Sequence, residues 1–276
     1  MREFNGRVAA ITGAGSGIGR ALALALAGRG CHLALCDIDE PRLEETSQRC
    51  RAYGVTVSAH AVDVAEESAV MAWATDAVAE HGAVHLLVNN AGVALIATVE
   101  EAKVEDLRWL MGINYWGVVH GTKAFLPHLK ASGDGHIVNL SSVFGLVSVP
   151  TQSAYNSAKF AVRGFSDALR MELEIAGAPV SVTTVHPGGV KTNIARSARA
   201  YDGGHAMSGG VMEDKTFERL AITTPHRAAR RILTAVEKDR RRVLVGPDAA
   251  VIDVISRLPV GLYQRAIVRG ARRRRG

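Results

Sequence analysis

Short apolar runs alternate with segments of helical periodicity along most of the chain. The apolar runs predict seven strands, at residues 8–11, 31–36, 55–62, 84–88, 136–140, 180–185 and 242–245. Helical patterns lie between and after them, at residues 18–26, 42–53, 66–81, 105–126, 155–175 and 227–238. Because this alternation is typical of right-handed βαβ crossovers, it predicts an α/β fold in which helices cover both faces of a doubly wound parallel sheet.

Two segments fall outside this alternation. Residues 191–224 lack sustained periodicity and are rich in Gly, Ser and Met, so we interpret them as a lid over the substrate or a pair of short helices. Residues 248–276 form a C-terminal extension, with an apolar stripe at helical spacing made of Val251, Ile255, Leu258 and Leu262. Pro259 is expected to break or kink that helix. We expect a single domain over residues 1–276, with its core at about 6–247.

The first predicted strand ends in a glycine turn, residues 12–19, with the sequence Thr-Gly-Ala-Gly-Ser-Gly-Ile-Gly. Glycines at such a turn allow the backbone to approach a phosphate, and the helix that follows supplies free N–H groups and a positive dipole end. Taken alone, the pattern also fits a tight turn that binds nothing. If the turn has a ligand, that ligand is expected to be an anion.

Asp37 lies 20 residues after Gly17, at the end of the second predicted strand. In dinucleotide-binding folds an acidic residue at this spacing accepts hydrogen bonds from the adenosine ribose hydroxyls, and its charge would repel a 2′-phosphate. Neither Ser16 nor Ile38 offers a basic side chain to such a phosphate. The alternative is an aspartate that merely starts the turn before Pro41. The pattern favours NAD over NADP.

Tyr155 and Lys159 lie four residues apart at the start of a predicted helix, on one face of it. A nearby ammonium favours the phenolate, which makes a tyrosine a usable proton donor or acceptor near neutral pH. Ser142 lies thirteen residues before Tyr155 and could supply a second hydroxyl. Without further context, an exposed pair with no role would be the ordinary interpretation of Tyr155 and Lys159.

The combination of these features with Asn89-Asn90-Ala91-Gly92 resembles the short-chain dehydrogenase/reductase family, over residues 6 to about 247. Further positions match the family's motifs, namely Asp37, Asp63, Asn114 and Pro187-Gly188 followed by Thr192. The resemblance implies a Rossmann fold with strand order 3-2-1-4-5-6-7. It also implies a homo-oligomer, a tetramer or a dimer, formed through the helices that hold Asn114 and Tyr155.

The resemblance implies a role for each catalytic candidate. Tyr155 would be the acid/base, Ser142 would bind the substrate oxygen, Lys159 would lower the tyrosine pKa and hold the nicotinamide ribose, and Asn114 would anchor a proton-relaying water. Hydride transfer leaves an alkoxide-like oxygen in the transition state, and two hydroxyl donors such as Ser142 and Tyr155 can stabilise it without a metal. Phe144 joins Ser142 and Tyr155 as a substrate-binding candidate.

The cofactor-binding candidates come from the strand ends and from the catalytic helix. Val190 and Thr192 would contact the nicotinamide carboxamide. The full set is Gly13, Gly15, Ser16, Gly17, Ile18, Gly19, Asp37, Ile38, Asp63, Val64, Asn90, Ala91, Gly92, Tyr155, Lys159, Pro187, Gly188, Val190 and Thr192.

We therefore expect an NAD-dependent oxidoreductase that interconverts a secondary alcohol and a ketone. One alternative is an epimerase or dehydratase with tightly held NAD, which the glycine spacing and the short C-terminal region disfavour. Another is a nicotinamide-sensing protein without turnover. Apolar residues beside the motifs favour an apolar substrate, although core packing explains some of them equally well: Val93, Leu95, Ile96, Val143, Phe144, Leu146, Val149, Met207 and Met212.

The net charge of +6 is concentrated near the C-terminus. Residues 225–276 contain 14 Lys and Arg against 4 Asp and Glu, whereas residues 1–224 carry a net charge of −4. The basic residues are not interleaved with aromatic ones, and no zinc-finger or helix-turn-helix spacing is present, so nucleic acid is not an expected partner. The extension is expected to pack on the body or a neighbouring subunit, or else to make a weak contact with an anionic membrane.

Cysteine usage and the N-terminal sequence bear on location. Cys31, Cys36 and Cys50 are odd in number and lack CxxC spacing, which favours neither a disulfide framework nor a zinc site. The first residues lack the apolar segment of a signal peptide, and no apolar run reaches the roughly 18 residues of a membrane span. A cytoplasmic protein is the expectation.

Overall fold

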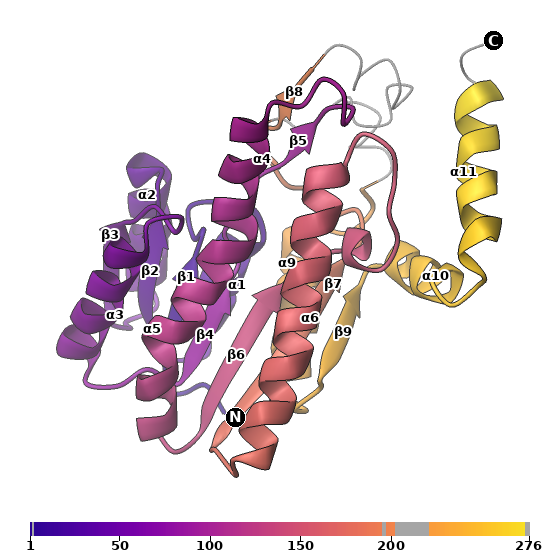
Figure 1. Cartoon of the computed structure of the whole chain (residues 1–276). Coiled ribbons are helices and arrows are strands. Elements are labelled where there is room, and N and C mark those ends of the chain that lie inside the picture. The colour runs from indigo at the N-terminus through magenta and orange to yellow at the C-terminus, as the bar shows by residue number, and fades with distance from the viewer. Residues whose placement is uncertain (2, 195–196, 202–220, 274–276) are drawn as a thin grey trace.

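A seven-stranded parallel sheet lies at the centre of the molecule, between two layers of helices (Figure 1). This computed structural model describes residues 1, 3–194, 197–201 and 221–273. The sheet order is β3-β2-β1-β4-β6-β7-β9, which confirms the doubly wound fold and the order expected of its seven main strands. The strands are β1 (Val8–Thr12), β2 (His32–Asp37), β3 (Val57–Ala61), β4 (Leu86–Asn89), β6 (Gly135–Leu140), β7 (Val180–Pro187) and β9 (Arg242–Val245).

Two groups of helices cover the two faces of the sheet. One face carries α1 (Gly17–Ala27), α2 (Glu40–Arg51) and α9 (Pro225–Glu237), and the other carries α3 (Glu67–His81), α5 (Gly117–Ala131) and α6 (Ser153–Ile175). On the first face Leu22 and Ile232 are completely buried, and on the second Trp73 packs edge-on against Phe125 with ring centroids 4.8 Å apart. Because both faces are covered, the central strands are continuous apolar runs rather than alternating ones.

The segment predicted as one helix over 105–126 is more complex. It begins as α4 (Val104–Met111), passes through the π-helical turn η1 (Gly112–Trp116), and continues as α5 to Ala131. A Cβ on Gly117 would lie 2.8 Å from the Val64 side chain, and one on Gly121 would collide with Asn89. The glycines therefore allow α5 to pack closely against Val64 and Asn89, as their small size suggested. The π-helical turn has no signal in the sequence pattern.

Sequence periodicity also missed a small second sheet, in which β5 (Leu95–Ile96) pairs with β8 (Arg199–Ala200). Strands of two residues are too short to produce a pattern. Arg199 and Tyr201 hold this sheet against α4, because both donate hydrogen bonds to the Asp106 carboxylate. Most of the segment interpreted as a lid, residues 202–220, lies outside the described residues.

The C-terminal extension contains two helices, α10 (Pro247–Ile255) and α11 (Val260–Arg273). They separate near Pro259, as expected for a residue that cannot continue a helix. Over the part of the chain that the structure describes, no helix combines the length and the hydropathy needed to cross a membrane.

Candidate active site

The functional candidates lie on loops at the carboxyl ends of the parallel strands, which all meet at one edge of the sheet. In folds of this kind, ligands bind at that edge, near the point where the strand order reverses. Here the reversal lies between β1 and β4, so the loops that follow these two strands should form the centre of the site.

The loops after β1 and β4 are tied together by the side chains of Thr12 and Asn90. Thr12 Oγ1 accepts hydrogen bonds from the backbone N–H groups of Asn90 and Ala91, at 2.9 and 3.0 Å. Asn90 Nδ2 in turn donates to the carbonyls of Thr12 and Gly13, at 2.9 and 3.1 Å. A Cβ on Gly13 would lie 2.9 Å from this amide, and Gly13 adopts φ +65°. Asn90 thus shapes the glycine turn, and Thr12 is a supporting residue that the sequence analysis did not single out.

The glycine turn leads into the N-terminus of α1, where an anion would find free backbone donors. Ser16 occupies the N-cap position and its side chain makes no capping hydrogen bond, so it leaves the first-turn N–H groups, which include that of Ile18, without a side-chain acceptor. A Cβ on Gly17 would lie 3.1 Å from the Thr192 methyl group. A Cβ on Gly19 would collide with the Gly13 carbonyl. The backbone is therefore exposed to a ligand here, and Thr192 lies beside the same turn.

Asp37 is anchored at the end of β2 by hydrogen bonds from the backbone. Its Oδ2 accepts from Gly15 N at 2.8 Å and its Oδ1 accepts from Asp39 N at 3.0 Å. Ile38 beside it is 71% exposed and would meet whatever lies against this strand end. Arg42 is the basic residue nearby, and its Nε pairs with Asp39 at 3.4 Å. The edge of this subsite is therefore dominated by a fixed carboxylate.

Asp63 and Val64 follow β3 on the loop that leads to α3. Asp63 Oδ1 accepts a hydrogen bond from Ala65 N at 2.9 Å, which closes a tight turn. Val64 is buried, and its carbonyl contacts His120 Nδ1 at 3.0 Å. The structure thus places both residues on a rigid loop at the ligand edge, while their contact with a cofactor stays a prediction.

Ser142, Tyr155 and Lys159 converge at the ends of β6 and α6. Ser142 begins the 3-10 turn η2 (Val143–Gly145), where its Oγ accepts from Phe144 N at 3.1 Å, and it also forms a hydrogen bond with Tyr155. Lys159 Nζ lies 5.5 Å from the centroid of the Tyr155 ring and donates to the Leu140 carbonyl at 2.9 Å. The predicted constellation therefore forms, and the Phe144 ring packs edge-on against Tyr155 with centroids 6.2 Å apart.

The protonation of this group is governed by burial. Burial raises the pKa of the Tyr155 phenol to about 12, and the hydrogen bond with Ser142 acts in the opposite direction. Burial lowers the pKa of Lys159 to about 8. Because the two groups are neighbours, a proton lost near neutral pH belongs to the pair rather than to either residue alone.

Asn114 is completely buried in the π turn η1. Its Oδ1 accepts from Val93 N at 2.8 Å and its Nδ2 donates to the Val93 carbonyl at 2.9 Å. A Cβ on Gly92 would lie 3.3 Å from Asn114 Oδ1 and 3.7 Å from Lys159 Nζ, so these three residues surround one point. The side chain clamps the loop after β4, and its role in anchoring a water stays a prediction.

His186, the second-last residue of β7, is a positioning residue that the sequence pattern did not reveal. It is completely buried, and its Nδ1 donates to the Ser142 carbonyl at 3.0 Å. Burial lowers the pKa of this imidazole to about 4, which keeps it neutral. A polar residue at the end of an apolar strand was the available signal, since buried polar groups need partners.

Asp248, the second residue of α10, was also missed. Its Oδ2 accepts from Gly189 N at 2.6 Å, and a Cβ on Gly188 would collide with this carboxylate. The loop is further fixed because Gly188 N donates to the Val245 carbonyl and buried Val190 pairs with Thr223. The start of the C-terminal extension therefore holds the Pro187–Gly189 loop in place.

One wall beside Tyr155 is apolar. Leu95, Leu110 and Ala158 are buried there, with Val93 and Tyr201 packed against them. Val143 and Leu146 are likewise buried, whereas Val149 lines a groove on another face of α6. Met207 and Met212 lie outside the described residues.

Comparisons with known proteins agree with this geometry. The family model for short chain dehydrogenases matches residues 7–202. SadH of Mycobacterium tuberculosis, whose name describes an oxidoreductase, is 50% identical over 270 residues, which cover 98% of this chain and 97% of that protein.

Solved structures are similar over comparable lengths. A short chain dehydrogenase/reductase from Burkholderia phymatum in complex with NAD is 34% identical, with a TM-score of 0.84 and coverage of 91% of this chain and 93% of its own. An alcohol dehydrogenase from the archaeon Thermococcus sibiricus complexed with 5-hydroxy-NADP is 27% identical, with a TM-score of 0.74 and coverage of 87% and 95%. On the family match and the SadH similarity, this chain belongs to the short-chain dehydrogenase/reductase family of oxidoreductases.

Proposed function

We propose that this protein is an NAD(H)-dependent oxidoreductase that interconverts a secondary alcohol and a ketone, with an apolar substrate. The observation that carries the proposal is the convergence of Ser142, Tyr155 and Lys159 at the sheet edge where the strand-end loops gather. The buried Lys159 beside the partly buried Tyr155 supports catalysis, because burying a charged group is costly without a compensating role.

The residues at the ligand edge fit a dinucleotide. A Cβ on Gly13 or Gly19 would clash with neighbouring backbone, Gly17 adopts a positive φ, and the N-terminus of α1 offers backbone N–H groups to a diphosphate. When bound, the nicotinamide would supply a hydride acceptor in oxidation and a hydride donor in reduction. Thr192, next to Gly17, and the Pro187–Gly189 loop would hold the nicotinamide end.

Two hydroxyl groups would act on the substrate oxygen. The Ser142 hydroxyl donates a hydrogen bond to it, and Tyr155 removes its proton in alcohol oxidation or returns one in ketone reduction. Lys159 stabilises the phenolate through its positive charge. The Leu140 carbonyl orients the lysine by accepting a hydrogen bond from its Nζ. Oxidation thus releases one proton through Tyr155 as the carbon loses one hydride.

The choice of NAD over NADP rests on Asp37. Its carboxylate is held in place by Gly15 N and Asp39 N, so it cannot easily move away from a 2′-phosphate. Arg42 is engaged with Asp39 instead of being directed to a phosphate. The Burkholderia relative was solved with NAD, which is consistent with this preference.

The substrate class is inferred from the wall beside Tyr155. The partly buried Val93 and Tyr201, which pack on the buried Leu95 and Leu110, offer hydrocarbon and aromatic surface. Burying an apolar substrate against such a surface is favourable by roughly 25 cal/mol per Å². A sugar or an acid would leave polar groups unpaired there.

Turnover of a panel of secondary alcohols tests the proposal. The panel should include aliphatic, aromatic, steroid and retinoid alcohols, each assayed with NAD and NADP by the absorbance of the reduced cofactor. We expect NAD-linked oxidation, with the highest kcat/KM for the more apolar members. NADP-linked efficiency equal to or above that with NAD would contradict the cofactor assignment. Absence of turnover across the panel with both cofactors would contradict the activity.

A further inference from the structure

The helix α10 has its apolar side turned toward solvent. Val251 and Val254 on this helix and Leu258, in the turn that follows it, are 59%, 63% and 46% exposed; we call them the apolar ridge. The residues that α10 buries are Ala249 and Asp253. Of the stripe expected to pack on the body, Val251, Leu258 and Leu262 are exposed and Ile255 is partly buried, so it is largely uncovered, which is unusual for aliphatic side chains at helical spacing.

The orientation of α10 is fixed by polar contacts on its inner side. Asp253 pairs with Arg242 of β9 and with Arg257, each at 2.9 Å. Asp248 accepts the hydrogen bond from Gly189 N at the start of the same helix. Rotating α10 to bury the apolar ridge would break its contacts with Arg242 and Gly189, so the outward position of the ridge is built into the fold.

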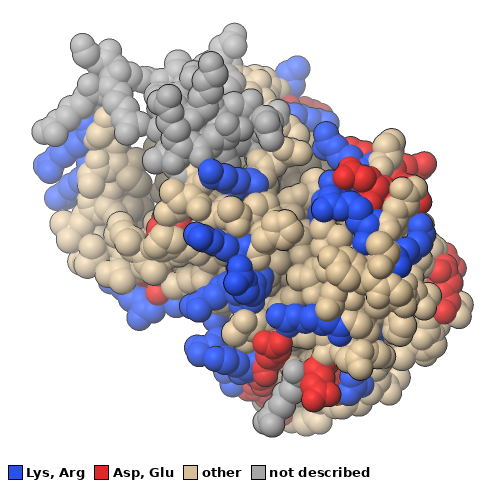
Figure 2. All heavy atoms as spheres, turned by 180° about the vertical axis from the view of Figure 1, so that it is seen from behind, with Lys and Arg blue, Asp and Glu red and all other residues tan. Residues whose placement is uncertain are grey.

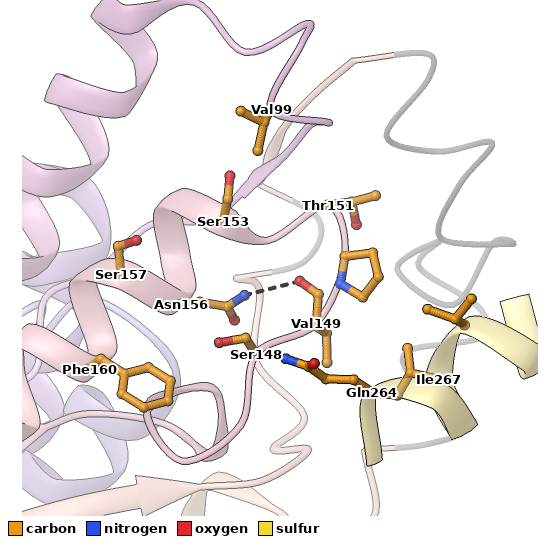
Figure 3. Close-up of a pocket in the computed structure, with 12 residues that line it drawn as sticks. Val99, Ser148, Val149, Thr151, Ser153, Asn156, Ser157, Phe160, Gln264 and Ile267 are labelled. Atoms are coloured by element: carbon orange, nitrogen blue, oxygen red, sulfur yellow. Dashed lines mark hydrogen bonds between the residues drawn. The ribbon is translucent and has the colours of Figure 1, made fainter. Parts of the chain in front are cut away.

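The next helix, α11, extends this exposed surface. Val260 and Leu262 at its start are 57% and 56% exposed. Its other side faces a groove of about 660 Å³, where Gln264 and Ile267 stand opposite the loop at Val149 and the helix α6 (Figure 3). Because the helix borders an open groove instead of a packed core, little apolar burial holds it to the body.

The chain that follows α10, including α11, carries a strongly positive charge. After Asp253 the sequence contains seven arginines and no acidic residue. Within residues 260–272, Arg265, Arg269 and Arg272 have no acidic partner among the residues that the structure describes. In Figure 2, seen from behind, blue side chains lie among tan surface on the side where α11 stands. Exposed aliphatic groups are thus combined with unpaired positive charge.

We propose that α10 and α11 form a docking surface for an anionic lipid bilayer. The apolar ridge would enter the boundary between headgroups and acyl chains, and the arginines would contact headgroup phosphates, which is how interfacial helices bind. A second copy of the chain is a poorer occupant, because a two-fold contact through this surface would set the same arginines against one another. Charge complementarity therefore selects the lipid.

The docking surface lies beside the active site. Since α10 directly follows β9, it starts at the edge of the sheet where the catalytic loops gather, and Asp248 links it to the Pro187–Gly189 loop. If the proposed apolar substrate is correct, the bilayer would serve as its reservoir. That consequence rests on the proposed function, whereas the membrane contact does not.

Vesicle flotation of the full chain tests the docking surface. Vesicles of phosphatidylcholine alone are compared with vesicles that also contain phosphatidylglycerol, at low and at physiological salt. We expect binding only to the anionic vesicles, and weaker binding at higher salt because ions screen the arginines.

Two sets of variants assign the contact to these helices. Arg265→Gln/Arg269→Gln/Arg272→Gln should bind anionic vesicles on the order of 100-fold more weakly, since each basic residue near such a surface contributes roughly fivefold. Val251→Gln/Val254→Gln/Leu258→Gln should also lose most of the binding. The matched controls lie elsewhere on the exposed surface and should bind as the unmodified chain does; they are Arg227→Gln/Arg230→Gln/Arg231→Gln on α9 and Met171→Gln/Ile175→Gln on α6.

Three results would overturn the proposal. The first is the absence of binding to anionic vesicles at low salt. The second is binding that both variant sets of α10 and α11 retain. The third is a drop in solution mass, measured by sedimentation velocity, when the apolar ridge is replaced, because the surface would then be a contact between copies of the chain. The far-UV circular dichroism spectrum and the thermal unfolding midpoint of each variant serve as the check of folding, so these outcomes stay distinct from a failure of the proposed reaction.

Discussion

At the scale of single residues, the site depends on side chains whose first partners are backbone atoms. Asp37, Asn90 and Asn114 each hold a loop in place through hydrogen bonds to backbone atoms, and each presents the same loop to a ligand. Such residues combine a structural and a binding role, so their substitution will affect both. Experiments at these positions should therefore compare two ligands or two readouts on the same variant.

The cofactor preference can be tested at Asp37 and Ile38. In Asp37→Ala/Ile38→Arg, removal of the carboxylate and gain of a guanidinium should favour a 2′-phosphate. We expect the ratio of kcat/KM for NAD to that for NADP to fall by at least about tenfold, because a hydrogen bond to a charged group contributes about 1.5–3 kcal/mol. Using the ratio cancels the loss of the Gly15 contact, which affects both cofactors.

The neighbouring carboxylate provides the control for this experiment. Glu40 is exposed in the first turn of α2, and Glu40→Gln removes one negative charge from the same region while Arg42 stays paired with Asp39. Its NAD/NADP ratio should stay within about twofold of the unmodified enzyme, since surface charges interact weakly in water. An equal fall of the ratio in both variants would show that Asp37 has no special role.

The close approach of the catalytic candidates was predictable from the sequence, whereas the residues that support them were not. Tyr155 and Lys159 share a helix, so their spacing alone places them on one face. Thr12, His186 and Asp248 act across the fold, on partners 44 to 79 residues away in the chain. No local pattern reports a contact of that kind, so these residues became apparent only from the folded arrangement.

At the scale of elements, strands and helices were predicted well where burial alone decides them. All five residues of β1 are buried, and its continuous apolar sequence predicts a strand that is covered on both faces. The π turn at Asn114 and the pairing of β5 with β8 depend instead on contacts with other parts of the chain. Tertiary contacts determine such features, so propensity and periodicity could not predict them.

The link between α10 and the Pro187–Gly189 loop gives a prediction at this scale. Asp248→Ala removes the acceptor for Gly189 N and should loosen the loop proposed to hold the nicotinamide end. We expect the Kd for NADH, measured by fluorescence titration, to rise about tenfold, because a hydrogen bond to a charged group contributes roughly 1.5–3 kcal/mol.

The conservative variant separates positioning from general damage. Asp248→Asn keeps an oxygen that can accept from Gly189 N, so it should restore most of the NADH affinity. Equal losses in Asp248→Ala and Asp248→Asn would mean that the carboxylate charge, and not its hydrogen bond to the loop, is what matters. An unchanged Kd in both would remove Asp248 from the account of the site.

At the scale of the whole molecule, two buried histidines make stability depend on pH. Burial lowers the pKa of His136 to about 3 and that of His186 to about 4. Below the ordinary histidine pKa of about 6.5 the unfolded chain takes up protons that the folded protein does not. The free energy of unfolding should therefore fall by up to about 1.4 kcal/mol per pH unit for each of them as the pH drops from 6.5 toward 4.

Urea unfolding at pH 7 and pH 5 measures this effect. His136→Gln removes one of the two groups, so the loss of stability between these pH values should be smaller in the variant, whatever its stability at pH 7. His226→Gln, at an exposed position on α9, serves as the control and should show the same pH dependence as the unmodified protein. A pH dependence unaltered by His136→Gln would contradict the prediction.

The central claim is that Tyr155 is the acid/base of a nicotinamide-linked oxidoreductase, and one comparison tests it most directly. In Tyr155→Phe the ring and its packing against Phe144 remain, but the proton donor is gone. With the best alcohol of the panel, we predict that kcat falls by at least about 100-fold, the typical contribution of general acid–base catalysis, while the Kd for NADH stays nearly unchanged. If the variant keeps more than about a tenth of the unmodified rate, the loss is smaller than general acid–base catalysis typically contributes, and the account is contradicted.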